Sequence, residues 1–315
     1  MPLRRQIFPL FVMIALGLLT GCTESPSTPA TATSSSSPLP SPTPTQSPMA
    51  LYERGLFHQR AGEWEQAIFL FSQALQLQPD LAPAYRARAA AYLALGEAER
   101  ALQDAQMAVA LTPDLPEAHA LLGEVLWRKF HDPIQALAAY DEAVRLDPAL
   151  APALFAARWA CAETAGLTDR MAQLALEHER EYPSPLGAYY KGRALLAQGA
   201  RRAAIEVVRE AILEGDSLAA LWFVLGDAYA ADGAWPEALT CYEETWRRME
   251  AGDPSLGTVL AHPEQALLRA LGTAYLHVGR CAEAEEVFRR AAALSANDPD
   301  LPTLIGRAII CLAAR

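Results

Sequence analysis

The sequence has few of the residues on which most enzyme and nucleic-acid-binding sites depend. Lysine occurs only as Lys129 and Lys191, and the net charge of −11 argues against binding to nucleic acid or to an acidic membrane surface. The six histidines are scattered, without a His-Glu-x-x-His pair, so we expect no bound metal. There is neither a phosphate-binding glycine loop nor a Gly-x-Ser-x-Gly nucleophile motif. These absences favour a protein that binds other molecules without catalysing a reaction, and we expect no cofactor.

Cysteine is also sparse. Four of the five cysteines, Cys161, Cys241, Cys281 and Cys311, stand among apolar neighbours in helical patterns, which is typical of small core residues. Their spacing singles out no pair, so the sequence leaves open whether any of them form a disulfide.

The fifth cysteine ends an apolar N-terminal segment. Arg4 and Arg5 precede an apolar run from about Ile7 to Leu19, which is shorter than the roughly 20 residues of a membrane-spanning helix. The run closes on Leu19-Thr20-Gly21-Cys22, and the whole arrangement resembles the signal peptide of a bacterial lipoprotein. The resemblance implies removal of residues 1–21, lipid attached to Cys22, and an extracytoplasmic protein anchored to a cell membrane. Which membrane holds it stays open, and an uncleaved N-terminal anchor is the alternative.

Residues 22–48 form a second distinct segment. They are rich in Ser, Thr and Pro, and Glu24 is the only charged residue among them. Such a composition builds no core, and proline-rich chain extends by about 3.1 Å per residue. We therefore expect a disordered tether between the lipid and the rest of the chain. Whether it is glycosylated stays open.

Beyond residue 48 the composition becomes rich in Ala, Leu and Glu, and small residues recur at a fixed interval. Gly55, Ala89 and Gly123 are evenly spaced, and the same interval separates Gly192 from Gly226. This pattern resembles the tetratricopeptide repeat (TPR) family, whose unit of about 34 residues is a pair of antiparallel helices that cross at small residues. We expect helix crossings at Gly55, Ala67, Ala89, Ala101, Gly123, Ala136, Gly192, Ala204, Gly226, Ala238, Gly272 and Ala284.

The resemblance implies an all-α fold. It predicts a right-handed TPR superhelix, an α-α solenoid of about seven helix-turn-helix repeats over residues 49–298, with a C-terminal closing helix over residues 299–315. Each repeat relies on its neighbours to bury its apolar face. Glycines are expected to turn the chain between helices at Gly62, Gly96, Gly199, Gly233 and Gly279.

Three places depart from the regular pattern. The fourth repeat, residues 151–184, is degenerate because Arg158 stands where Gly or Ala is expected, so we expect its helices to lie slightly apart or rotated. An insertion near residues 250–264 predicts an irregular loop, which is either a longer connection or a dedicated binding loop. The closing helix carries the apolar run Ile309-Ile310-Cys311-Leu312, which could contact a partner or a second copy of the chain.

Members of the family bind through the inner surface, which is lined mainly by the first helix of each repeat. Aromatic and arginine side chains are enriched at the energetic centres of interfaces, and we expect such a groove to grip an extended or helical segment of another protein. For any one ring, packing between repeats is the alternative. The family's inward positions correspond here to Tyr52, Arg86, Trp127, Phe155, Trp159, Tyr189, Tyr190, Arg193 and Phe223, with Arg86 and Arg193 available to carboxylates.

The functional expectation is a membrane-tethered extracytoplasmic scaffold or adaptor that binds another protein, in the assembly of an envelope complex. Recognition of carbohydrate or cell wall by the aromatic rings is the alternative. The Lys and Asn positions of the family's carboxylate clamp are not matched, which argues against chaperone-tail binding. The only candidates for a catalytic role are Glu124 and Glu163, which we interpret as solvated helix carboxylates.

Overall fold

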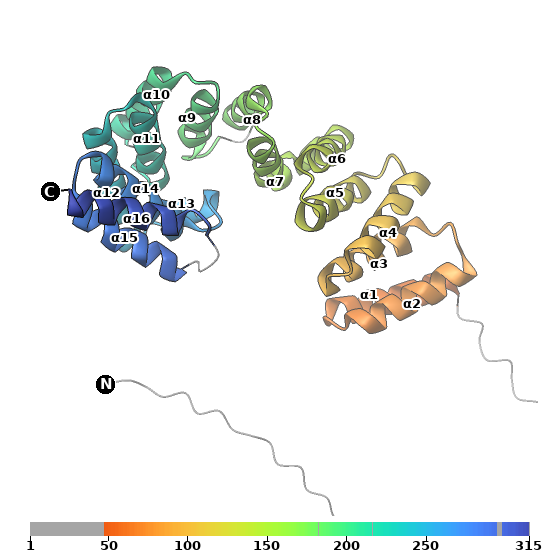
Figure 1. Ribbon diagram of the computed structural model, residues 1–315. Helices are drawn as coiled ribbons and strands as arrows, with labels where there is room; N and C mark the ends of the chain where they lie inside the picture. The colour runs from red at the N-terminus through yellow and green to blue at the C-terminus, as the bar shows by residue number, and fades with distance from the viewer. Residues whose placement is uncertain (1–46, 182, 216, 295–297, 315) are drawn as a thin grey trace, which may run out of the picture. The chain divides into compact units, whose positions relative to one another are not determined.

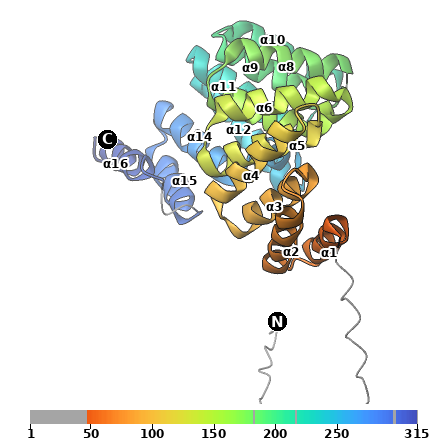
Figure 2. The same ribbon diagram turned by 90° about the vertical axis from the view of Figure 1, so that its right-hand side faces the viewer.

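The structure is a computed structural model that describes residues 47–181, 183–215, 217–294 and 298–314. These residues lie in one compact unit that begins at Gln46. Throughout this range the regular structure is helical, without strands, which confirms the predicted all-α fold (Figures 1 and 2). No helix in it is long and apolar enough to cross a membrane. The predicted signal peptide, the lipid site Cys22 and nearly all of the tether lie outside the described residues.

Consecutive helices pair and then stack on the next pair. The first helices of the pairs are α1 (Pro48–Arg60), α3 (Ala82–Leu95), α5 (Pro116–Val125), α7 (Ala151–Thr164), α9 (Gly187–Ala197), α11 (Ala219–Asp232) and α14 (Pro263–His277). The second helices are α2 (Trp64–Leu77), α4 (Ala98–Leu111), α6 (Pro133–Leu146), α8 (Thr168–Glu181), α10 (Arg201–Glu214), α12 (Trp235–Glu250) and α15 (Cys281–Leu294). Four shorter or unpaired elements complete the unit: η1 (Leu126–Phe130), η2 (Pro148–Leu150), α13 (Ser255–Val259) and α16 (Leu301–Ala313).

Turns and helix starts follow from local residues. All five glycines predicted to turn the chain adopt positive φ, between 76° and 83°, a conformation that only glycine enters without strain. Proline stands at the first or second position of several helices, for example Pro48, Pro116 and Pro263. Proline suits these positions because it lacks an N–H that would in any case have no partner within the helix.

The two helices of a repeat meet where a small residue of the first faces a large side chain of the second. All twelve predicted crossing residues are buried. A Cβ atom at Gly226 would lie 2.5 Å from Cε1 of Tyr242, and one at Gly272 would lie 2.5 Å from Cε1 of Phe288. The same ring contact joins Gly55 to Phe71. The side chain therefore occupies the space that a Cβ would need.

The second repeat has alanine at both positions of this contact. Its first helix carries Ala89 in place of glycine, and the residue sixteen positions further on is Ala105 rather than an aromatic ring. Both alanines are fully buried in one cluster with Val125. A larger residue on the first helix is thus accommodated by a smaller one on the second.

The degenerate fourth repeat accommodates its arginine with two carboxylates. Arg158 is only 3% exposed, and its Nε lies 2.8 Å from Asp141 Oδ1 on α6. Its Nη1 lies 2.7 Å from Glu177 Oε1 on α8. The helices of this repeat, α7 and α8, pack less closely than those of any other pair in the described range, as expected. A buried guanidinium is tolerated here because both neighbouring helices supply compensating charge.

The insertion is more ordered than predicted. It contains the short helix α13, which packs against α11, and it does not form the irregular loop that was predicted. The N–H of Ala219 donates to Asp253 Oδ2 at 2.7 Å, and the N–H of Ala220 donates to Ser255 Oγ at 3.1 Å. Leu256 on α13 is fully buried and belongs to the largest hydrophobic cluster. These contacts satisfy the first backbone donors of α11, which explains why the segment is fixed.

The closing helix is held by a disulfide that the sequence did not reveal. Cys281 at the start of α15 and Cys311 near the end of α16 are bonded, with their Cα atoms 5.7 Å apart, a separation typical of disulfides. The sequence left this pairing open; Cys281 is buried, as expected, and Cys311 is half-buried. Cys161 and Cys241 are free and buried, as expected.

We predict that substitution of Gly55 by alanine destabilises the protein by about 1–3 kcal/mol, because the new methyl group overlaps the ring of Phe71. In a Phe71→Ala background, the same substitution should cost close to nothing, since the second repeat already pairs Ala89 with Ala105. Chemical denaturation of the four chains of this double-mutant cycle measures the coupling. Equal costs of Gly55→Ala in both backgrounds would show that the ring contact does not set the helix spacing.

Candidate functional site

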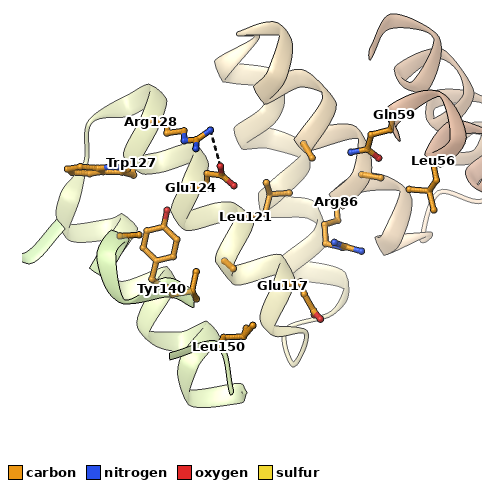
Figure 3. A pocket seen from close by; sticks show the side chains of 15 residues that line it. Leu56, Gln59, Arg86, Glu117, Leu121, Glu124, Trp127, Arg128, Tyr140 and Leu150 are labelled. Atoms are coloured by element: carbon orange, nitrogen blue, oxygen red, sulfur yellow. Dashed lines mark ion pairs between the residues drawn. The ribbon is translucent and has the colours of Figure 1, made fainter. Parts of the chain in front are cut away.

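A groove that runs from the first repeat to the fourth is the principal candidate site. Its volume is about 570 Å³, and side chains from the first helices of four consecutive repeats line it (Figure 3). The apolar lining consists mainly of small and aliphatic side chains, so the groove is open between the helices rather than filled by rings. The lining residues are Leu56, Gln59, Arg86, Ala87, Ala90, Glu117, Ala120, Leu121, Glu124, Trp127, Arg128, Tyr140, Leu150, Leu154 and Ala157.

A π-helical turn places two of these side chains at one end of the groove. Gly123 and Ala136 are thirteen residues apart, whereas the corresponding pairs in the first two repeats are twelve apart. The structure accommodates the extra residue in η1, which is followed by His131 with a φ of 50°. Trp127 and Arg128 lie in this turn and line the groove. Such π-turns recur at functional sites.

The two arginines of the groove differ in their partners. Arg128 Nη1 lies 3.1 Å from Glu124 Oε1, and both side chains are well exposed, so this pair contributes little to stability. Arg86 is half-buried and forms no ion pair with any described residue. Its Nε is buried and has no hydrogen-bond acceptor within the described part of the chain. A buried donor without an acceptor is costly, so an incoming acceptor at Arg86 is favoured.

Most of the predicted aromatic groove is buried. Phe155, Trp159, Tyr189, Tyr190 and Phe223 are between 1% and 8% exposed. They belong to the largest hydrophobic cluster, so packing between repeats accounts for these five rings. Among the predicted rings, Trp127 and Tyr52 are half-buried. Tyr52 packs against Phe71, with ring centroids 5.8 Å apart, and Trp127 lines the groove.

Two of the buried rings, those of Phe155 and Tyr190, contact a histidine. The ring of Tyr190 lies 4.7 Å from Phe155 and 4.8 Å from Trp159, centroid to centroid, in edge-to-face geometry. His178 on α8 lies 4.9 Å from Phe155 and 5.1 Å from Tyr190. Burial lowers the pKa of His178 below its ordinary value. This cluster joins the fourth repeat to the fifth.

Arg193 is occupied within the protein, contrary to the expectation that it is available to a partner. Its Nε lies 3.1 Å from Glu163 Oε1 on α7, and its Nη1 lies 2.9 Å from Asp227 Oδ2 on α11. Asp227 also accepts a hydrogen bond of 2.8 Å from the hydroxyl of Tyr242. Arg193 thus links three consecutive first helices. Of the two arginines proposed for binding, Arg86 alone keeps its charge without a partner in the described range.

Sequence reasoning missed most of the groove because its lining is largely leucine and alanine. The signal was present in the period, since Arg86, Ala120 and Leu154 follow one another at the repeat interval and all line the groove. Leu56, Ala90 and Glu124 form a second such series. Following the equivalents of Tyr52 and Leu56 through each repeat, whatever the residue type, would have outlined the site.

The groove offers little chemistry beyond binding. The two carboxylates considered for catalysis are both in ion pairs, Glu124 with Arg128 and Glu163 with Arg193. Across the described residues, no group of three or more His, Cys, Asp or Glu side chains could hold a metal ion.

Comparison with known proteins identifies the repeats. Models of the family described as tetratricopeptide repeat match residues 48–81, 189–254 and 256–300. The C-terminal part of a TPR repeat-containing protein from Cytophaga hutchinsonii is 16% identical, with a TM-score of 0.53 over 81% of this chain and 99% of that one. The Cut9 and Hcn1 hetero-tetramer of the APC/C is 18% identical, with a TM-score of 0.51 over 85% of this chain and 49% of that one. At these identities the likeness concerns the fold alone. Among curated proteins, none matches the sequence.

We predict that His178 makes the folded state sensitive to acid. The unfolded chain binds a proton at this residue with the ordinary pKa of 6.5, whereas the folded state resists protonation. Stability is therefore fully present above pH 6.5 and declines as the pH falls below that value. Urea unfolding at several pH values should show a steeper loss for the natural chain than for His178→Gln. Parallel curves for the two chains would contradict the assignment.

Proposed function

We propose that the chain is a tetratricopeptide repeat scaffold that holds a segment of another protein in the groove of its first four repeats. Tetratricopeptide repeats serve as protein-interaction scaffolds, and the observation that carries the proposal is the groove itself. It is apolar along its floor, open to solvent, and lined by successive first helices. Concave solenoid surfaces of this kind suit extended or helical segments.

The floor of the groove selects apolar side chains. Leu121 and Leu154 stand on adjacent first helices, and the small side chains of Ala87, Ala90 and Ala120 also line the groove. A leucine-sized side chain that enters this space gains about 1.5–3 kcal/mol from burial. The partner segment should therefore present at least one large aliphatic or aromatic residue.

Arg86 selects the second feature of the partner. Its guanidinium lines the groove without an ion pair in the described range, and its buried Nε lacks an acceptor. A carboxylate can accept two parallel hydrogen bonds from a guanidinium, which is the strongest common arrangement for this group. The partner should therefore carry an Asp, a Glu or a terminal carboxylate close to its apolar anchor.

The scaffold is proposed to be lipid-anchored through Cys22 and to work outside the cytoplasm, on a tether over residues 22–48. The lipoprotein-like pattern of the N-terminal sequence supports this location. The disulfide between Cys281 and Cys311 supports it independently, because disulfides persist mainly in oxidising compartments. Assembly of an envelope complex is the role that best combines an anchor, a long tether and a peptide groove.

The geometry favours a protein segment over a carbohydrate. Sugar recognition, the alternative, requires a row of exposed rings, but the rings of Phe155, Trp159, Tyr189, Tyr190 and Phe223 are buried. Trp127 alone of that row lines the groove. One half-buried ring is a small platform for sugar stacking, whereas the leucines and Arg86 match a peptide.

We predict that Arg86→Gln weakens partner capture about tenfold, because it removes a charge-assisted contact worth roughly 1.4 kcal/mol or more. Leu121→Glu should abolish capture, since it puts a charge on the apolar floor. Crosslinking and isolation from native membranes, followed by quantitative mass spectrometry, measures both effects. Arg202→Gln, an exposed arginine on α10 outside the groove, is the matched control and should bind normally. Unchanged capture by Leu121→Glu would rule out the groove as the binding site.

We predict that Cys22→Ser releases the protein from membranes. The variant should lose incorporation of labelled fatty acid and move to the soluble fraction, because the acyl chains supply the membrane affinity. Thr23→Ala serves as the control and should stay membrane-bound. If Cys22→Ser still sediments with membranes, the anchor is the uncleaved apolar segment instead.

A further inference from the structure

The last helix of the described chain, α16, resembles the first helix of a repeat. Gly306 on α16 follows Gly272 at the same interval that separates Gly192 from Gly226. In the preceding repeats, the space at the equivalent glycine is filled from the second helix. A Cβ at Gly123 would lie 2.8 Å from Tyr140, and one at Gly192 would lie 2.7 Å from Val208.

At Gly306 the corresponding space is open. No described atom lies within 4 Å of the position that a Cβ would take there. Beside this opening, Ile309 and Ile310 are exposed, and Ile310 is 70% exposed. Figure 2 shows α16 beside α15. On the opposite face of α16, Leu301 and Ala308 are buried in a cluster with residues of α15. The open face thus corresponds to the one that the second helix covers in the preceding repeats.

The same helix also carries a side chain suited to this space. Ile310 stands four residues after Gly306, so the two lie one turn apart on the same face. Val208, which fills the space at Gly192, shows that a β-branched aliphatic side chain fits such a position. The helix therefore carries both an open space, at Gly306, and a side chain that can fill such a space, that of Ile310. A surface of this kind is complementary to itself, which is the requirement for a two-fold symmetric contact.

We propose that α16 pairs in antiparallel fashion with α16 of a second copy of the chain, each Ile310 filling the space over Gly306 of the other copy. In this register Gly306 meets Ile310 of the other copy twice, and Thr303 meets Ala313 twice. This register gives a specific residue contact for the self-association that the apolar run led us to expect. This dimer goes beyond the groove function and does not depend on it.

The charges of α16 permit this pairing. Arg307 is its only charged side chain within Leu301–Ala313. It lines a small depression with Leu276, His277 and Cys311, on the side of α16 that faces α14. The face with Gly306 and Ile310 therefore brings no charge into the contact. The disulfide of Cys311 to Cys281 holds α16 in place and keeps this face outward.

The contact is small, so the dimer is weak. Two helices of thirteen residues bury much less than the roughly 800 Å² per partner of a standard interface. We therefore expect association in the micromolar range in solution. Copies that share a membrane meet at a much higher local concentration.

Co-isolation of two differently tagged full-length copies from the same cells, after mild crosslinking, tests the proposal. The natural copies should co-isolate, and Ile310→Glu should reduce co-isolation about tenfold. Leu213→Glu is the matched control, because Leu213 is an 82% exposed leucine on α10, and it should have no effect. Retention of the Cys281 to Cys311 disulfide and of the circular dichroism spectrum shows that each variant is folded.

An exchange of the two residues separates complementarity from a general loss of apolar surface. The double variant Gly306→Ile with Ile310→Gly places the introduced isoleucine of one copy over the introduced glycine of the other, so co-isolation should return to near the natural level. The proposal is overturned if the natural copies do not co-isolate, which includes the case where a different protein covers the face. It is also overturned if Ile310→Glu has no effect, or if the exchanged variant stays as low as Ile310→Glu while folded.

Discussion

The structure depends on one steric contact, in which a large side chain of the second helix rests on a glycine or alanine of the first. The rings of Phe71, Tyr242 and Phe288 make this contact at Gly55, Gly226 and Gly272, and the pair Ala89 and Ala105 is its smaller version. The contact sets the distance between the helices of each repeat. Because this contact recurs along the chain, successive repeats stack with first helices on one face, and that face carries the groove.

Polar contacts decide which parts of that face are free to bind. Beyond the third repeat, Arg158 and Arg193 are buried or held by carboxylates of neighbouring helices, and aromatic rings fill the remaining space. These interactions make the middle of the solenoid a continuous core. Along the groove on α1, α3, α5 and α7, by contrast, small residues line the inner face and Arg86 has no partner in the described range. Binding capacity is therefore expected at the N-terminal end, which is the end that the proposed tether presents from the membrane.

The regular spacing of small residues predicted the fold and the helix crossings, because one steric requirement recurs at each crossing. The burial of Phe155 and Trp159 stayed open at the level of sequence, because it depends on contacts with Tyr190 of the next repeat that no sequence pattern specifies. The disulfide of Cys281 and Cys311 was equally hidden, because the two are far apart in the sequence and only the placement of α16 brings them together. The ordered insertion was missed because its capping of α11 is a long-range contact. The sequence pattern thus predicted the contacts that recur from repeat to repeat, whereas the contacts that occur only once could be found only in the structure.

The most direct test of the central claim is site-specific photo-crosslinking from the groove in living cells. A photoreactive residue at Leu121, on the groove floor, should capture one protein partner through a segment that carries an apolar residue and a carboxylate. The same residue at Phe69, exposed on the second helix α2, should not capture that partner. Capture of the same partner from Phe69 and not from Leu121 would contradict the account, because the binding surface would then lie outside the groove.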